Sequence, residues 1–248
     1  MLMTLRTNTV SIQSLGRIES TTSRRIDRIG HQPPWLDGRQ IDSDPRLMDE
    51  SHRLRYQVYC LERGFLNADN YPDQREYDEF DRHSLHLGVV DGEGELIATA
   101  RLVKVNMVGL PLFRHCRIYP REYELFQDST RVAEISRLCV SRTLRRRHIG
   151  TASVAIQLYR AIYQASKRNG FTHWLVATEP SLQRLLTSLK VPFREVGPTT
   201  DYYGPVAPYL VDLSRWDQVI VSRTLPALHS FLDGLEPEYS PLRNARLS

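Results

Sequence analysis

The sequence is poor in cysteine and has no long hydrophobic run. No stretch approaches the roughly 18 consecutive apolar residues that mark a membrane-spanning helix. Residues 1–30 also lack the apolar core segment of a secretory signal. The three cysteines, Cys60, Cys116 and Cys139, are isolated, and neither they nor the histidines show metal-ligand spacing. We therefore expect a cytoplasmic protein with reduced thiols, no metal site and no integral membrane segment.

What is present is typical of a globular protein, apart from one concentrated basic segment. The chain has 248 residues, of which 41% are hydrophobic and 25% charged, enough for one large domain or two small ones. The net charge is only +4, but five basic residues fall within the seven positions from Arg142 to His148. Such a cluster favours an anionic partner.

By composition, the chain divides into three segments. Residues 1–43 are rich in Ser, Thr and Arg without periodicity, so we interpret them as a disordered extension, with a transit peptide as the alternative. A domain is expected over residues 44–213, opening with an N-cap and a helix-starting proline at Asp44-Pro45. Residues 214–248 form a C-terminal tail, helical in pattern up to residue 232, which Pro226 is expected to kink or split.

Between these limits, the apolar pattern predicts a mixed α/β (α+β) fold. One face of the first helix, which ends at Gly64-Phe65, carries Leu47, Leu54, Val58, Leu61 and Phe65. A polar connection over residues 66–82 ends in an acidic cluster, and a hairpin then turns at residues 91–94. Further strands are predicted at 132–140, 171–178, 193–196 and 207–213, and further helices at 150–168 and 179–190. This order predicts a mixed central sheet with helices on both faces.

The basic segment leads into a helix N-terminus with the features of a phosphate site. The first amides of a helix have no intrahelical partners, and the helix dipole favours negative charge there. Gly150 permits close approach of the backbone, Ala152 leaves the next turn uncrowded, and the arginines before them add positive potential. A phosphate or a phosphopantetheine diester suits this position. The alternative is a solvated basic turn that happens to precede a helix.

The motif Arg147-x-x-Gly150-x-Ala152, between a strand and a helix, resembles the acyl-carrier-binding turn of the GNAT acyltransferase superfamily. The resemblance implies a GNAT-like fold in which strand 134–140 splays from its neighbour, so that a pantetheine arm pairs there like an added strand. It also implies a set of residues that bind the carrier and its phosphopantetheine, namely Val140, Arg142, Arg145, Arg146, Arg147, Gly150, Thr151 and Ala152.

A second set of residues narrows the resemblance, which covers residues 45–213. The set resembles acyl-homoserine lactone (autoinducer) synthases and N-acyl amino acid synthases, and it consists of Arg55, Tyr59, Phe65, Asp78, Asp81, Arg101, Glu134 and Arg137. Segments 56–60 and 208–213 are similar to acyltransferases associated with exosortase (PEP-CTERM) systems. Tyr59 and Phe65 replace the phenylalanine and tryptophan usual in the lactone synthases, which argues against a lactone product.

Transfer of an acyl group to an amine requires the amine to be neutral, so a base must take a proton from its ammonium form. Glu134 is the candidate base; the alternative is a glutamate paired with an arginine for structure. Arg137, three positions along the strand, faces the opposite side unless a bulge intervenes. Arg101 is a candidate for a substrate carboxylate or for an ion-pair network. Asp78 and Asp81 are candidates to hold the acceptor's ammonium group. The alternative is that they pair with the arginines.

We therefore predict an N-acyltransferase that moves a fatty acyl chain from acyl-carrier protein, or from acyl-coenzyme A, to the amino group of an amino acid or derivative. Direct attack needs no tightly bound cofactor, and Cys139 is expected to be an inert buried thiol. An acyl-homoserine lactone synthase using S-adenosylmethionine is the alternative enzyme. Alternatives of another class are an inactive acyl-carrier binder and a nucleic-acid-binding module. Nucleic acid is disfavoured because no recognition-helix or stacking-aromatic pattern surrounds the arginines.

Overall fold

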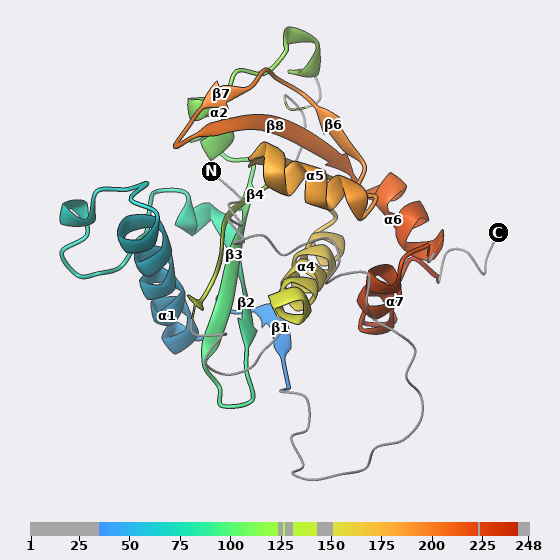
Figure 1. Ribbon diagram of the computed structural model, residues 1–248, viewed down its shortest axis with the longest axis horizontal. Coiled ribbons are helices and arrows are strands. Elements are labelled where there is room, and N and C mark those ends of the chain that lie inside the picture. Colours follow the sequence, from blue (N-terminus) through green and yellow to red (C-terminus); the bar gives the residue numbers. More distant parts are fainter. Residues whose placement is uncertain (1–34, 124–125, 127–130, 143–150, 223, 243–248) are drawn as a thin grey trace.

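The computed structural model describes residues 35–123, 126, 131–142, 151–222 and 224–242, and eight strands within them form a mixed sheet (Figure 1). The strand order is β1-β2-β3-β4-β5-β8-β6, with β7 paired to β8. Adjacent strands are antiparallel except β4 and β5, which are parallel. The strands are β1 (Asp37–Gln40), β2 (Ser84–Val90), β3 (Leu96–Lys104), β4 (Val132–Val140), β5 (His173–Thr178), β6 (Phe193–Glu195), β7 (Thr200–Asp201) and β8 (Pro205–Asp212).

Helices cover both faces of this sheet (Figure 1). α1 (Pro45–Tyr56) packs on β3 and β4 from one side, and α4 (Thr151–Arg168) packs on β1, β2 and β3 from the other. The core on the α4 side includes Leu158 and Ile162 of the helix. The predicted fold class is confirmed. Other helical segments are η2 (Gln57–Glu62), η3 (Ala68–Asn70), η4 (Asp81–His83), α2 (Pro111–His115), η5 (Pro120–Glu122), α5 (Pro180–Ser188), α6 (Leu213–Ser222) and α7 (Pro226–Asp233).

α1 begins where the sequence predicts, because Asp44 caps it. The Asp44 carboxylate accepts hydrogen bonds from the backbone amides of Arg46 and Leu47 at 3.0 and 3.1 Å. The helix does not run regularly to Gly64, because it widens into the π-helical η2. The wider turn rotates the side chains that follow. The prediction that Leu61 lies on the buried face is therefore wrong, since its side chain is 55% exposed.

Residues 37–40, expected to lie in a disordered extension, form β1 against residues 87–90 of β2. β1 also lies directly on α4. A Cβ atom at position 38 would meet the backbone oxygen of Gln157 at 2.4 Å, so the close approach of strand and helix requires Gly38. The boundary expected before residue 44 is corrected accordingly, and β1 is part of the sheet. Residues 1–34 lie outside the described residues.

The C-terminal helices share the main core. α7 starts at Pro226, the residue expected to split the tail. Trp216 and Ile220 of α6 belong to the same apolar cluster as Phe231 of α7, α4 and the sheet. Residues 213–233 thus complete this core rather than form a separate appendage. In the part of the chain that the structure describes, every helix is too short or too polar to cross a lipid bilayer.

β4 and β5 separate after a short stretch of pairing. The pairs that join them are Val132–His173, Ala133–Trp174 and Glu134–Leu175. Beyond Glu134 the two strands continue without pairing to each other, β4 to Val140 and β5 to Thr178. We call the opening between residues 135–140 and residues 176–178 the fork, and Glu134 stands at its apex. The predicted splayed strand pair is confirmed.

Candidate active site

A bulge in β4 brings Glu134 and Arg137 to one face of the sheet. The register between β3 and β4 shifts between Thr99 and Arg101, which inserts one extra residue into β4. Arg137 lies at this bulge with φ of +50°, in the left-handed region that residues other than glycine rarely adopt. The extra residue reverses the alternation of side chains. The bulge that Glu134 and Arg137 need to face the same side of the sheet is therefore present.

Tyr59 of η2 supports the bulge. Its hydroxyl donates a hydrogen bond to the backbone oxygen of Leu138 at 2.9 Å. Its ring centre lies 5.7 Å from the guanidinium carbon of Arg137. The side chain is buried and packs with Phe65 and Cys139. A phenylalanine, usual here in the lactone synthases that the sequence resembles, has no hydroxyl to make this bond.

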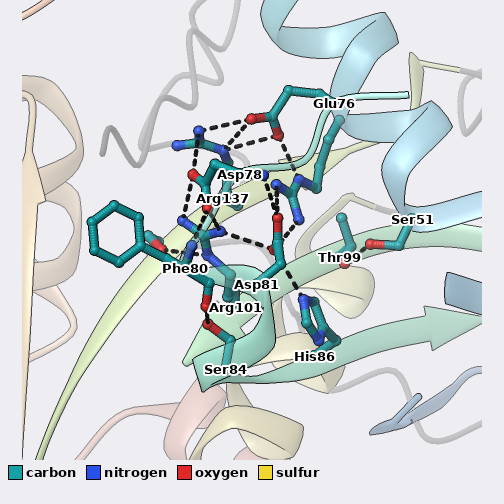
Figure 2. Close-up of polar contacts among 12 residues, drawn as sticks. Ser51, Glu76, Asp78, Phe80, Asp81, Ser84, His86, Thr99, Arg101 and Arg137 are labelled. Atoms are coloured by element: carbon teal, nitrogen blue, oxygen red, sulfur yellow. Dashed lines mark hydrogen bonds and ion pairs between the residues drawn. The ribbon is translucent and has the colours of Figure 1, made fainter. Parts of the chain in front are cut away.

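Three arginines and three carboxylates form a buried ion-pair network on this face of the sheet (Figure 2). From α1, the Arg55 guanidinium donates to Glu76 at 2.6 Å and to both oxygens of Asp81 at 2.7 and 3.1 Å. The acidic end of the polar connection, which carries both carboxylates, is thereby joined to the helix. The members of the network are Arg55, Glu76, Asp78, Asp81, Arg101 and Arg137.

Asp78 joins the two strand arginines. Arg101 of β3 donates to both oxygens of Asp78 at 2.6 and 3.2 Å, and its Nε donates to Ser136 at 3.2 Å. Arg137 donates to Asp78 at 2.9 Å and to Glu76 at 2.7 to 2.9 Å. The side chains of Arg101 and Arg137 therefore lie on the same face of the sheet. The sequence did not single out Glu76; its only signal was its place in the acidic end of the polar connection.

Opposite charges outweigh burial in setting the ionisation of the network. Burial alone raises the pKa of Glu76, but the guanidinium groups of Arg55 and Arg137 lower it from 4.5 to about 2. Burial also raises the pKa of Asp81, and the charge of Arg55 helps to bring it well below its usual range. The pKa of Asp78 is lowered against burial by neighbouring arginines. All three carboxylates are thus ionised at neutral pH and balance the three arginines.

Asp78 is the most accessible member of the network. Its side chain is 25% exposed, whereas that of Asp81 is 13% exposed and those of the arginines at most 7%. The donors of Arg101 bond to Asp78, Asp81 and Ser136. Of the two roles expected for Arg101 and both aspartates, substrate binding or mutual ion pairing, these contacts are those of ion pairing. Asp78 also keeps an exposed portion that a ligand can reach.

A pair of histidines borders the network. His86 lies between two carboxylates, with Nδ1 2.8 Å from Asp42 and Nε2 3.0 Å from Asp81. Burial lowers the pKa of His86, but its hydrogen bonds to both carboxylates raise it overall. His52, Asp81 and His86 offer ligand atoms within 4.8 Å of one another. However, the guanidinium groups of Arg55 and Arg101 both donate to the same oxygen of Asp81, which disfavours a divalent cation there.

Glu134 stands where the two strands separate, on the same face as the network. Positions two apart in a strand point the same way, so its side chain shares the face of Ser136. It is fully buried, and its Oε2 accepts a hydrogen bond from the backbone amide of Leu112 at 2.8 Å. That amide belongs to the first turn of α2, which begins with Pro111. The predicted base is therefore held at the apex of the fork by a fixed donor.

Aromatic side chains gather on this face. Phe65 stacks on Tyr203 with ring centres 5.3 Å apart, and Tyr202 stacks on His115 at 3.8 Å. Burial raises the pKa of Tyr202 above its usual value. The sequence predicted Phe65 as a site residue. It did not predict the contact with Tyr203, which comes from a turn more than a hundred positions later.

The opposite face of the fork opens onto an apolar cavity of about 90 Å³. Ile135 and Val176, the first residues beyond the last β4–β5 pair, belong to its lining. The lining consists of apolar and aromatic side chains, which suits an apolar ligand. It consists of Ile135, Ile156, Tyr159, Trp174, Val176, Leu186, Leu189, Val191, Phe193, Val211, Trp216, Ala227, Leu228 and Phe231.

The predicted carrier-binding residues lie at the end of β4 and the start of α4. Val140 is the last residue of β4, and Arg142 is exposed and forms an ion pair with Glu62 at 2.6 Å. Thr151 is the first residue of α4. Four other members lie outside the described residues: Arg145, Arg146, Arg147 and Gly150. For Thr151 and Ala152 the described part is the backbone alone.

Two sequence comparisons agree with this geometry. Residues 54–154 match the model of the acetyltransferase (GNAT) domain, a span that includes the ion-pair network, Glu134 and the first residues of α4. The chain is also 25% identical over 150 residues to the acyl-homoserine-lactone synthase of Aliivibrio fischeri (strain ATCC 700601 / ES114). This alignment covers 58% of the chain and 73% of that protein.

Solved structures share the fold. BjaI, a CoA-dependent acyl-homoserine lactone synthase solved with SAM and isopentyl-CoA, is 18% identical with a TM-score of 0.59, over 87% of this chain and 100% of that one. FeeM, an N-acyl amino acid synthase from uncultured soil microbes, is 18% identical with a TM-score of 0.55, over 75% and 94%.

The chain carries an acetyltransferase (GNAT) domain over residues 54–154 and is an acyltransferase. Its likeness to an acyl-homoserine lactone synthase is one of sequence and fold, and its likeness to an N-acyl amino acid synthase is one of fold. The predicted enzyme class is thereby confirmed. The narrower assignment to the exosortase-associated group stays a prediction.

Proposed function

We propose that this protein is an N-acyltransferase that transfers a fatty acyl chain from a phosphopantetheine thioester to the amino group of an amino acid or derivative. The observation that carries the proposal is that the fork has the candidate base on one face of the sheet and the apolar cavity on the other. Glu134 at the apex points to one face, and Ile135 and Val176 open onto the apolar cavity on the other. A thioester held at the apex has a base on one side and space for its acyl chain on the other.

The donor enters the fork as an extended chain. Beyond Glu134 the backbone of β4 has no partner in β5, so the amides of a pantetheine arm can pair with it as an added strand. The N-terminus of α4, at Thr151, offers amides to the donor's phosphate. The exposed Arg142 and the arginines after it favour an acidic partner, so we propose acyl-carrier protein as donor, with acyl-coenzyme A as the alternative. The cytoplasm is the expected compartment.

The reaction is a direct displacement at the thioester carbonyl. Glu134 accepts a proton from the ammonium form of the acceptor, directly or through a water molecule, and the neutral amine attacks the carbonyl carbon. The C–N bond forms, and the C–S bond breaks as the tetrahedral intermediate collapses. The pantetheine leaves as a thiol after taking up a proton. Such a base contributes about 10²–10⁴-fold to the rate.

The acceptor approaches from the network face. Asp78 is the accessible carboxylate there, and the paired arginines hold it in place, so it is suited to accept a hydrogen bond from the acceptor's ammonium group. Arg55, Arg101 and Arg137 are occupied by carboxylates. We therefore assign Arg101 and Arg137 to positioning Asp78, and Arg55 to holding Glu76 and Asp81, and none of the three to binding a substrate carboxylate.

An acyl-homoserine lactone synthase that uses S-adenosylmethionine is the second candidate. Two observations favour it: the relative from Aliivibrio fischeri has that activity by name, and aromatic rings surround the acceptor face. A cationic sulfonium group interacts favourably with such rings. The two candidates share the donor, the base and the fork, and differ in the acceptor.

The experiment is a product assay on the purified full chain. Acyl-carrier protein and coenzyme A, each loaded with a series of acyl chains, are mixed with single amino acids, amines or S-adenosylmethionine, and products are identified by mass spectrometry. We expect an acyl amino acid or acyl amine. A lactone formed only with S-adenosylmethionine selects the second candidate. No amide and no lactone with any donor refutes the proposed function.

A further inference from the structure

We propose that α7 forms the end wall of the acyl cavity and thereby sets the longest acyl chain that the enzyme accepts. The inference rests on the proposed function, because it assigns the cavity to the acyl chain of the donor. Helix α7 contributes three residues to the lining, Ala227, Leu228 and Phe231. The helix belongs to the C-terminal segment that follows the sheet, so the wall is supplied by a part of the chain outside the matched GNAT domain.

The arrangement of elements gives the cavity a direction. Ile135 and Val176 lie at the fork, where the thioester is expected, and therefore form the entrance. α7 packs against α4 and α6, and it lies on the side of α4 away from β2, β3 and β4 (Figure 1). A chain that enters beside Ile135 and extends away from β4 meets α7 last. α7 therefore contacts the methyl end of the acyl chain and not its carbonyl end.

The end wall is rigid. Phe231 is buried and makes edge contacts with Tyr163 at 5.6 Å and with Trp216 at 6.2 Å between ring centres. The guanidinium group of Arg160, on α4, donates from Nε to the backbone oxygen of Phe231 at 3.1 Å. Added bulk at Gly234 would collide with the same guanidinium group. α7 is therefore fixed to α4 at its C-terminal end and acts as a fixed stop.

Two neighbouring positions on α7 allow the wall to be moved in both directions. Ala227 is a small lining residue, so a larger side chain there fills space that the acyl chain uses. Phe231 is a large one, and its truncation extends the cavity. Each methylene that enters or loses an apolar environment changes kcat/KM by about fourfold. Substitutions at these positions should therefore change the preferred chain length and not the chemistry at Glu134.

The experiment measures kcat/KM of the full chain for saturated acyl donors from butanoyl to hexadecanoyl, with one acceptor. Ala227→Phe, with Ala227→Leu as a milder version, should shift the optimum to shorter chains and lower kcat/KM for the longest preferred donor by at least tenfold. kcat/KM for the shortest donors should fall less than kcat/KM for the longest ones. Phe231→Ala should shift the optimum to longer chains. Ser230→Phe adds the same ring to an exposed position of α7 and should leave the profile unmoved.

A second readout separates this inference from the proposed function. Binding of free fatty acids of the same lengths is measured by the rise in the unfolding temperature, without turnover. The same opposite shifts in Ala227→Phe and Phe231→Ala support the inference even if no acceptor is found. The inference is overturned if folded variants change kcat/KM and fatty-acid binding by the same factor at every chain length. Absence of turnover in the wild-type chain, with length-dependent binding retained, refutes only the proposed function.

Discussion

Glu134 and Arg137, three positions apart on β4, project from the same face of the sheet. The bulge between them is what makes this possible, and the left-handed backbone of Arg137 is its local cost. Backbone strain of this kind persists only where surrounding contacts fix it. Those contacts are the hydroxyl of Tyr59 on Leu138 and the carboxylate of Glu76 on Arg137. The bulge thus connects the ion-pair network to the apex of the fork.

Replacing Glu134 by Gln should abolish most of the turnover while leaving the donor bound. The amide keeps an oxygen for the Leu112 backbone amide but cannot accept the proton of an ammonium group. We expect kcat to fall by about 10²–10⁴-fold. Initial rates of thiol release test this, with donor affinity measured by calorimetry. Glu122→Gln, at another buried glutamate, is the matched control, and equal losses in both variants would contradict the assignment of the base.

Tyr59→Phe tests the support of the bulge. The change removes the hydrogen bond to Leu138 without a change of packing, so unfolding should require about 1 kcal/mol less free energy. Because Arg137 and Glu134 are then held less firmly, kcat should fall by about two- to tenfold. Urea unfolding and steady-state kinetics measure the two effects. Tyr56→Phe, on the preceding turn, serves as control. Unchanged kcat in a destabilised Tyr59→Phe protein would show that the bulge does not matter for turnover.

The ion-pair network should contribute strongly to stability. Glu76→Gln leaves two buried guanidinium groups with one fewer carboxylate, and unfolding free energy should decrease by about 3–5 kcal/mol. Glu79→Gln breaks an exposed pair with Arg114 and should cost less than about 1 kcal/mol. Urea denaturation of both variants measures the contrast. Similar, small losses in the two variants would mean that the buried carboxylate is dispensable.

Acid should weaken the protein through the same carboxylate. The pKa of Glu76 in the folded state, about 2, is below the ordinary value of 4.5 that a glutamate has in the unfolded chain, so folding favours the ionised form. Its contribution, about 3 kcal/mol, is present above pH 4.5 and is lost as the pH falls to about 2. Unfolding free energy measured from pH 6 to pH 3 should fall steeply in the wild type and less steeply in Glu76→Gln. Parallel curves would exclude Glu76 as the source.

Cys139 should take no part in the reaction. Burial raises its pKa far above neutrality, and burial raises that of Cys60 to about 11, so neither thiol is a ready nucleophile. The native protein should resist alkylation by iodoacetamide, and Cys139→Ala should retain turnover at a stability cost of about 1 kcal/mol. Intact-mass spectrometry follows both alkylation and any acylated enzyme. An acyl adduct that forms and decays at the rate of turnover would instead indicate a covalent intermediate.

Local sequence signals predicted the elements that depend on neighbouring residues. Asp44-Pro45 located the start of α1, the turn at residues 91–94 located the hairpin, and Pro226 located the break before α7. The face of Leu61 was wrong because periodicity assumes a regular helix, and nothing local marks the π-helical turn. β1 was missed because four residues carry too little pattern, and its place depends on β2 and α4.

The site was predictable to the extent that resemblance supplied its residues. The charged positions and the fork followed from it, and the need for a bulge between Glu134 and Arg137 followed from strand alternation. Glu76 was missed because its partners, Arg55 and Arg137, lie on elements far away in the sequence. For the same reason no local pattern indicates that Phe231, near the end of the chain, lines a cavity that opens at Ile135.

The short pairing of β4 with β5 divides the sheet into two mechanical units. Strands β1 to β4 form one unit, and β5, β6, β7 and β8 form the other. Among the described residues, the ladder between β4 and β5 is three residue pairs long, and the Thr172 amide donates one further backbone hydrogen bond to Arg131 at 2.8 Å. A donor hydrogen-bonded within the fork bridges the two units at a point where the protein alone does not. Hydrogen exchange at residues 132–134 and 173–175 should therefore slow when donor is bound, so that the substrate itself stiffens the enzyme for the step that follows.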